Sequence, residues 1–223
     1  MLSLPEKLML LALKDKKGTV IFSASTALPY GLAGSVILEL VFQNRITLNN
    51  KKVEVLNEAP LEDPLLNRAF SLIKVSKRAR DVKHWVYRLE RKLKGLKKEI
   101  TERLIAREIL RKQEDQFLWI IPVRHYPMSN AAPEQEIRTR IHQVVLQHDT
   151  PTEQDTALLS LIKACGLINE VFKKDERKIA KKRIKEIVDK ERIGEAVSAV
   201  VNEITAAVTT VVLAASVASS SSN

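Results

Sequence analysis

Segment 74–98 concentrates the positive charge of this chain. It holds eleven Lys or Arg residues and two acids, Asp81 and Glu90, so its net charge is +9, while the whole chain of 223 residues carries +10. Two carboxylates cannot neutralise eleven cations, so the segment favours a polyanionic partner. The chemistry that it predicts is phosphate binding, on nucleic acid or on an anionic membrane surface. A solvated helix face is the alternative interpretation.

Four cations near the end of this segment are the candidate phosphate-binding residues: Arg91, Lys94, Lys97 and Lys98. The 3–4 spacing of Lys94, Lys97 and Lys98 places their side chains on one helical face. We therefore expect these three side chains to converge on a single phosphate, with Arg91 beside them.

An uncharged run follows at 117–123 and contains a Phe and a Trp. Phe117, Leu118 and Trp119 are the candidates for insertion into a membrane, because an indole ring can be buried at the interface while its N–H stays hydrated. The same run fits a buried core strand, and it also fits a strand through which two copies of the chain associate. Insertion, burial and homo-oligomerisation are therefore all open interpretations of this segment.

The sequence has no residues with the spacing of a catalytic or metal site. It lacks a Walker loop, a Gly-rich dinucleotide turn and a Cys/His cluster at metal-ligand spacing, and His142 and His148 are six residues apart, on different helical faces. The lone cysteine, Cys165, follows an apolar pattern and is expected to be a buried thiol. We therefore predict no enzymatic activity, no metal and no cofactor, and a chain suited to a reducing cytosol.

Apolar periodicity predicts the elements that must position these residues. Helices are expected over 4–14, 30–42, the segment after Pro64, 82–89, 93–109, 134–148, 153–172, 174–190 and 193–218. A short strand is expected at 19–22, and β-hairpins at 45–55 and 108–123, the second with its turn near 113–115. No Gly/Ser-rich linker divides the chain, so we expect one mostly α-helical domain over residues 1–223.

The last predicted helix contains fifteen residues without a charge, 204–218. A span of a bilayer needs about 20 residues. We expect a buried final helix, with a transmembrane anchor as the alternative.

Residues 4–55 follow the order helix, strand, helix and hairpin, which resembles a winged helix. Its recognition helix would be 30–42, in which Glu39 is the one charged residue. Such a helix cannot read base edges through direct hydrogen bonds. We therefore expect no nucleic-acid partner, although this interpretation stays the main alternative.

Short motifs in a fixed order run through nearly the whole chain. They are Leu10-Leu11-Ala12-Leu13-Lys14-Asp15, Lys17-Gly18, Gly31-Leu32, Ile37-Leu38-Glu39-Leu40, Arg45-Ile46, Ala59-Pro60, Asp63-Pro64-Leu65-Leu66, Val82-Lys83-His84-Trp85, Glu102-Arg103-Leu104, the 117–123 strand, Arg138-Thr139-Arg140-Ile141 and Leu158-Leu159-Ser160-Leu161-Ile162. In this order the chain resembles the Golgi phosphoprotein 3 family, and it looks like a prokaryotic-type member that begins at the first helix, without an N-terminal tail.

The resemblance implies a central apolar helical bundle, wrapped by amphipathic helices, with a protruding β-hairpin. It also implies binding of phosphatidylinositol 4-phosphate on Golgi membranes, and binding of the cytoplasmic tails of membrane proteins. The family's headgroup residues correspond here to Ser23, Ala33, Lys94 and Lys97, of which the two lysines keep the positive charge of the family's arginines.

The sequence therefore favours a peripheral membrane protein that binds anionic phospholipid, with phosphatidylinositol 4-phosphate as the candidate headgroup. Its basic patch and apolar hairpin would face the membrane, and the protein would lie in the cytoplasm, peripherally associated with the cytosolic face of that membrane. A lipid-independent adaptor, whose basic face holds an acidic peptide, is a further alternative.

Overall fold

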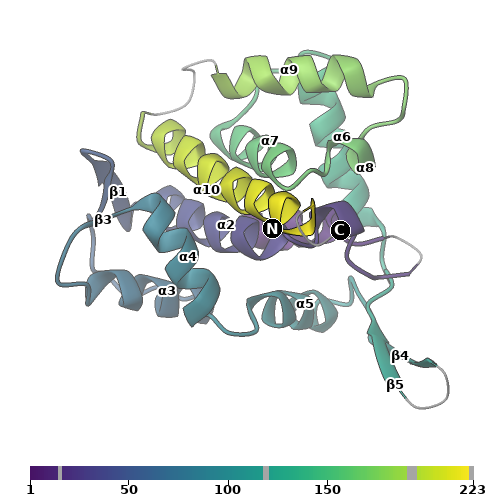
Figure 1. Cartoon of the computed structure of the whole chain (residues 1–223), viewed down its shortest axis with the longest axis horizontal. Helices are drawn as coiled ribbons and strands as arrows, with labels where there is room; N and C mark the ends of the chain where they lie inside the picture. Colours follow the sequence, from purple (N-terminus) through teal and green to yellow (C-terminus); the bar gives the residue numbers. More distant parts are fainter. Residues whose placement is uncertain (15–16, 118–120, 190–194, 221–223) are drawn as a thin grey trace.

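The computed structural model describes residues 1–14, 17–117, 121–189 and 195–220, which form a mostly helical fold, as expected (Figure 1). The elements of the first half are α1 (Leu4–Leu11), the 3₁₀ turn η1 (Phe22–Ala24), α2 (Leu28–Phe42), β1 (Ile46–Asn49), β2 (Lys52–Val55), α3 (Pro64–Lys74), β3 (Arg80–Asp81), α4 (Val82–Lys92) and α5 (Leu96–Ala106). Those of the second half are β4 (Gln113–Phe117), β5 (Ile121–His125), α6 (Ala132–Leu146), α7 (Glu153–Ala164), α8 (Ile168–Val171), α9 (Arg177–Asp189) and α10 (Glu195–Ser220).

Helix α2 lies at the centre of the molecule. It is apolar on nearly every side, and such a helix is stable only when it is surrounded by other elements. Helices α1, α3, α4, α5, α7 and α10 all contact it (Figure 1). The predicted central apolar bundle is therefore confirmed. The burial of α2 also excludes it as a recognition helix for a DNA groove.

Two glycines let neighbouring helices approach α2 closely. A Cβ built on Gly34 would lie 2.5 Å from Cγ2 of Ile204 in α10, and one built on Gly31 would collide with Sγ of Cys165. Cys165 is fully buried, as expected, and burial raises the pKa of its thiol to about 12. These two glycines thus allow α10 and the end of α7 to pack closely on α2.

Amphipathic helices wrap this core, and two of them begin at aspartate caps. Asp63 accepts hydrogen bonds from the N–H groups of Leu65 and Leu66 at the start of α3, and Asp81 accepts one of 2.6 Å from His84 N–H at the start of α4. Such caps satisfy N–H groups that the helix itself leaves unpaired. The two caps define where α3 and α4 begin, and these starts agree with the apolar pattern of the sequence.

The first hairpin agrees with its prediction and gains a third strand. Strands β1 and β2 pair antiparallel, with Ile46 opposite Val55, and β3 pairs with β2. The turn residues Asn50 and Lys51 both have positive φ values of 48° and 62°, as a two-residue hairpin turn requires. The strand expected at 19–22 is reduced to a single bridge between Leu13 and Val20, because Phe22 starts η1.

The second hairpin exists, but its predicted boundaries are wrong. Residues 113–115, expected to form the turn, lie in β4, and Phe117 ends that strand instead of belonging to the returning one. Phe117 pairs with Ile121, and Leu118 and Trp119 lie outside the described residues. An isolated two-stranded ribbon can carry polar residues on both faces, so the polar run did not mark the turn.

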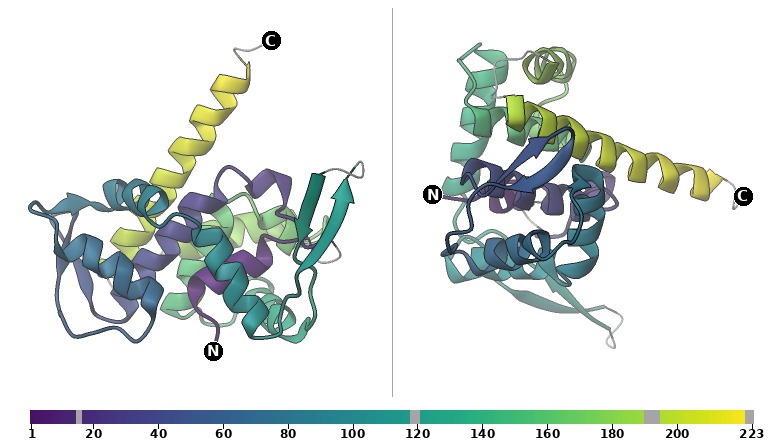
Figure 2. Two further views of the ribbon diagram at one scale, coloured as in Figure 1. Left: turned by 90° about the horizontal axis from the view of Figure 1, so that it is seen from below. Right: turned by 90° about the vertical axis from the view of Figure 1, so that its left-hand side faces the viewer.

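The expectation of a buried final helix is correct only for the first part of α10. Val197, Val200, Val201, Ile204, Ala207 and Val208 are buried, whereas the side chains at 209–218 are exposed or partly exposed. Both views in Figure 2 show the end of α10 extending beyond the rest of the molecule. By length and composition Val197–Ala218 could cross a membrane, and 33% of the apolar window within it is buried in the fold.

Candidate functional site

Helix α4 turns its apolar face to the core and its basic face to solvent. Val82, Trp85, Val86 and Leu89 are buried, and α4 packs against both α2 and α10. The exposed side of the helix carries Lys83, Arg91 and Lys92. Arg91, the first of the four candidate cations, therefore lies in the last turn of α4 and faces water.

The corner between α4 and α5 is built on Gly95. Leu93 and Leu96 are buried on either side of it, and Gly95 has φ +79°, in the left-handed region that glycine adopts without strain. A Cβ at Gly95 would meet no atom within 4 Å. Glycine is therefore favoured here by the left-handed backbone and not by a lack of space for a side chain. This turn lets the chain enter α5 at Leu96.

Because of this turn, the predicted arrangement of the three lysines on one helical face is wrong. Lys94 precedes Gly95 and lies outside α5, so Lys94, Lys97 and Lys98 do not share one helical face. Lys97 and Lys98 lie in the first turn of α5 and Lys94 lies just before it, and all three are exposed. The structure thus gathers them around the start of a helix.

This helix start carries positive charge that the described residues leave largely unneutralised. Gly95 has no side chain to cap α5, and the free N–H groups of a helix start attract anions. Arg91, Lys94 and Lys97 form no ion pair within the described part of the chain, and Lys98 forms a loose one of 3.6 Å with Glu102. Cations at a helix start repel its dipole, and a bound phosphate would reverse that penalty.

The acid in the first turn of α5 is occupied elsewhere. Glu99 pairs with Arg68 and, at 3.1 Å, with Arg103, which also binds Asp63. Burial alone would raise the pKa of Asp63, but the Arg103 guanidinium and the N–H groups at the start of α3 outweigh it and hold that pKa below its ordinary value. This network fixes α5 against α3 and keeps Glu99 from neutralising the lysines.

Two tyrosines connect Arg91 to the helices behind it. Arg91 Nε donates to the backbone oxygen of Tyr87 at 3.3 Å, and the Tyr87 ring meets Tyr30 of α2 edge to face at 5.7 Å. The Tyr87 hydroxyl donates to the carbonyl oxygen of Ala207 in α10, at 3.4 Å. Tyr87 therefore lies where α2, α4 and α10 meet, and Arg91 lies one helical turn after it on the surface of α4.

The remaining cations of segment 74–98 do not join one patch. Lys74 pairs with Glu58 at 2.7 Å, and Arg88 lies over the Trp85 ring at 5.6 Å. Arg78 and Arg80 line an open hollow of about 670 Å³ together with Lys51 and Lys52 of the first hairpin turn. The cations of segment 74–98 are thus spread from the end of α3 to the start of α5 instead of gathering at one point, and we call this stretch the basic band.

The positive charge of the basic band contributes to a lowered pKa of His84, the histidine within segment 74–98. Burial lowers the pKa of His84 from its ordinary value, and the charges of Arg80 and Arg88 lower it further. A lowered histidine pKa is the expected effect of a positive local potential on a partly desolvated imidazole.

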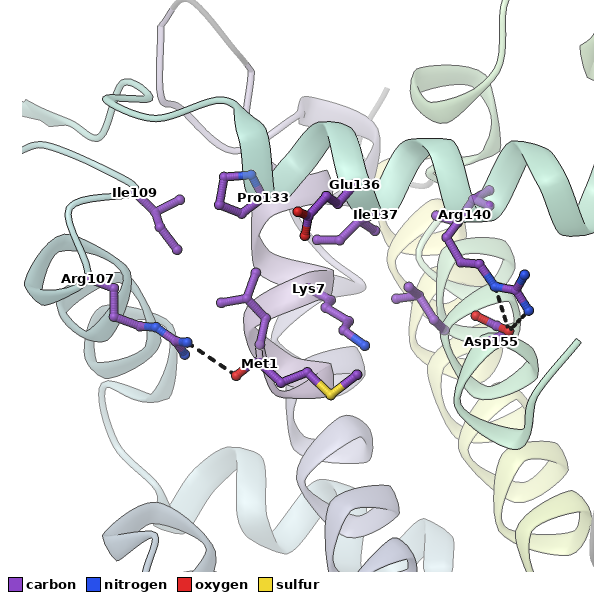
Figure 3. Close-up of a pocket in the computed structure, with 12 residues that line it drawn as sticks. Met1, Lys7, Arg107, Ile109, Pro133, Glu136, Ile137, Arg140 and Asp155 are labelled. Atoms are coloured by element: carbon purple, nitrogen blue, oxygen red, sulfur yellow. Dashed lines mark hydrogen bonds and ion pairs between the residues drawn. The ribbon is translucent and has the colours of Figure 1, made fainter.

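A second cavity, of about 400 Å³, lies between α1, the end of α5, α6 and α7 (Figure 3). Ile109, Pro133 and Ile137 form part of its apolar wall. Its two arginines are already paired, Arg107 with Glu6 at 3.1 Å and Arg140 with Asp155 at 2.8 Å. The cavity therefore offers a largely apolar surface with paired arginines, and it also contains Lys7 and Glu136, one charge of each sign, unlike the cationic α4–α5 corner.

Sequence reasoning missed one exposed aromatic residue beside a predicted headgroup position. Phe22 is 88% exposed at the start of η1 and precedes Ser23, which is also exposed, whereas Ala33 is buried within α2. Phe22 was assigned to a strand because it follows Val20 and Ile21. The neighbouring sequence Ser-Ala-Ser, with its low strand preference, is the signal that favours a turn there.

Comparison with known proteins supports the resemblance. Residues 4–204 match the family model described as Golgi phosphoprotein 3 (GPP34). The chain belongs to this family. A curated relative, vacuolar protein sorting-associated protein 74 of Schizosaccharomyces pombe, is 25% identical over 165 residues, which cover 65% of this chain and 48% of the relative. The chain thus spans about half the length of that GPP34-family protein.

Proposed function

We propose that this GPP34-family protein is a peripheral membrane protein that binds anionic phospholipid at the α4–α5 corner. The observation that supports this most is the start of α5, which has no side-chain cap, where Lys94, Lys97 and Lys98 are exposed and Glu99 is held by Arg68 and Arg103. A phosphate headgroup supplies the negative charge that this corner lacks.

Phosphatidylinositol 4-phosphate is the proposed headgroup, as family membership suggests. Lysine binds phosphate as a point charge and lacks the planar fork of arginine. Each basic residue near an anionic surface contributes about 1 kcal/mol. Arg91 with the three lysines would therefore support reversible binding, with modest discrimination between phosphoinositides and other anionic lipids.

The β4–β5 hairpin is the proposed apolar contact. In Figure 2 it runs upward in the left view, as the end of α10 does, and toward the lower right in the right view, where α10 runs to the right. Phe117 at the end of β4, with Leu118 and Trp119, would enter the lipid headgroup region there. The proposed location is the cytosolic face of a membrane, and the relative's name points to sorting, which makes the tails of membrane proteins candidate partners.

Vesicle co-sedimentation tests the proposal. The chain is mixed with neutral vesicles, with vesicles of mixed anionic lipid and with vesicles containing phosphatidylinositol 4-phosphate, at low and at physiological salt. We expect binding to anionic vesicles that salt weakens, and Lys94→Glu with Lys97→Glu should lower the affinity more than about tenfold.

A matched control changes the same charge elsewhere. Lys181→Glu with Lys182→Glu alters two exposed lysines of α9 and should leave affinity within about threefold, as nonspecific charge alone predicts. Equal losses in both double variants would contradict the site assignment. No binding of the unmodified chain to any vesicle would contradict the proposed function.

A further inference from the structure

The end of α10 exposes apolar side chains on the surface of the described fold. From Ile204 to Asn223 the sequence contains no charged residue. Val212, Leu213 and Val217 are 39%, 60% and 65% exposed. Contiguous apolar surface of this kind on a soluble protein marks a site of interaction.

The pattern of these residues distinguishes a lipid environment from a protein seam. A helix that packs on one partner has an apolar stripe flanked by charged residues. Here valine, leucine and alanine side chains point in all directions around the axis from 211 to 218, and the polar residues are the small, uncharged Thr209, Thr210 and Ser216. A helix that is apolar all round and uncharged suits hydrocarbon.

The position at which the helix leaves the fold points to the same surroundings. Tyr87 binds the backbone of Ala207, the last turn that is buried, and Tyr30 packs on Tyr87. Arg91, a headgroup-binding candidate, contacts the Tyr87 backbone. Tyrosine is enriched at the boundary between headgroups and acyl chains, and arginine is a common anchor at the same level. The projecting segment therefore starts at the level of the proposed headgroup site.

We propose that residues 209–220 of α10 insert into the membrane beside the lipid headgroup bound at the α4–α5 corner. Twelve helical residues measure about 18 Å, against about 30 Å for the hydrocarbon core, so residues 209–220 alone reach through one leaflet. This inference rests on the proposed membrane binding and names a second, apolar contact with the same surface.

Fluorescence from a single labelled cysteine tests the insertion. Leu213→Cys and Ile179→Cys are each labelled with an environment-sensitive dye; both native side chains are 60% exposed, one on the end of α10 and one on α9. Cys165 is buried and its thiol pKa is about 12, so the native cysteine does not compete for the label. With anionic vesicles we expect the dye at 213 to brighten about threefold or more and shift to shorter wavelength, and the dye at 179 to stay unchanged.

Co-sedimentation of the same samples separates the possible failures. If the labelled chain pellets with vesicles but the dye at 213 does not respond, the insertion is wrong and the proposed membrane binding stands. If the chain does not pellet at all, both are wrong. Brightening at 213 that depends on protein concentration and needs no lipid would show that a second copy covers the helix, and would overturn the insertion.

A variant gives an independent readout. Leu213→Asp with Val217→Asp should weaken vesicle binding about tenfold while leaving the fold intact, because both side chains are exposed. The matched substitution Ile179→Asp should leave binding within about twofold, since it adds one exposed charge far from the membrane. Full binding by the α10 variant would contradict insertion.

Discussion

Arg103 of α5 donates two hydrogen bonds, 2.7 and 2.8 Å long, to the two carboxylate oxygens of Asp63, the residue that caps α3. Forty residues separate the pair in the sequence. A two-pronged contact of this kind is among the stronger charge-assisted interactions and fixes orientation as well as distance. Asp63 and Arg103 thus hold the helix that bears Lys97 and Lys98 against the helix before the basic band.

Replacement of Asp63 should change both stability and its dependence on pH. The folded-state pKa of Asp63 is lowered, so its contribution is present above the unfolded pKa of about 3.9 and is lost as pH falls through the lower folded value. Asp63→Asn keeps a helix cap but loses the ion pair, and should reduce stability at pH 7 by about 1–3 kcal/mol.

Urea unfolding between pH 2 and 7 measures this effect. The Asn variant should lose less stability than the native chain as pH falls below about 4. Asp175→Asn, at an exposed position before α9, is the control and should change stability by less than about 0.5 kcal/mol. Parallel acid profiles for the native chain and Asp63→Asn would contradict the role assigned to the pair.

Gly34→Ala should destabilise the fold even though alanine favours helices. Alanine in a helix gains about 1 kcal/mol over glycine, but the added methyl would press on Cγ2 of Ile204 at 2.5 Å, and overpacking costs about 1–3 kcal/mol. Ile204→Leu removes the branch that collides. In a thermal unfolding double-mutant cycle, the pair should therefore recover at least half of the loss, and additive losses would contradict the direct contact.

Gly95→Ala should affect membrane affinity more than stability. No atom blocks the new methyl, so the cost is the left-handed backbone, about 1–2 kcal/mol. Relaxation of that backbone would move Lys94 relative to Lys97 and lower vesicle affinity. Gly95→Asn, which tolerates the left-handed region, should bind more tightly than the alanine variant, and equal affinities for the two would show that the corner's geometry is unimportant.

His84 should report anion binding at the basic band. Burial and the charges of Arg80 and Arg88 lower its pKa, so an anion that neutralises nearby charge should raise it. We expect an upward shift in an NMR titration of the imidazole when inositol 1,4-bisphosphate is added. His148, in the loop after α6, serves as the control resonance, and an unchanged His84 at saturating ligand would place the anion elsewhere.

The sequence predicted the elements whose burial is strong and periodic. Helix α2 is apolar throughout and α4 places Val82, Trp85, Val86 and Leu89 on one face, so their positions followed from hydrophobicity alone. Family membership followed from the order of short motifs. The ends of α4 and α5 were less predictable, because a single glycine in the left-handed region, Gly95, interrupts a run that otherwise favours helix.

Other features depend on contacts between distant residues. The i,i+4 spacing of Glu99 and Arg103 is visible in the sequence, but nothing near Glu99 shows that Arg68 also pairs with it. These two pairs keep Glu99 from neutralising Lys94 and Lys97. The hairpin boundaries failed because β4 is polar and the apolar run at 117–123 crosses from one strand into the next. The end of α10 is as apolar as its buried beginning, so composition did not reveal where the core stops.

Helix α10 is one continuous element of 26 residues that serves two surroundings. In its first part, Ile204 packs against Gly34 of α2, and in its last part, Leu213 is exposed on the surface. Selection therefore acts on the two parts through different losses. Changes up to Val208 would reduce the amount of folded protein, because these side chains are buried. Under the proposed insertion, changes after Val208 would leave the fold intact and alter membrane attachment, so the last turns could diverge with the lipid composition of the membrane.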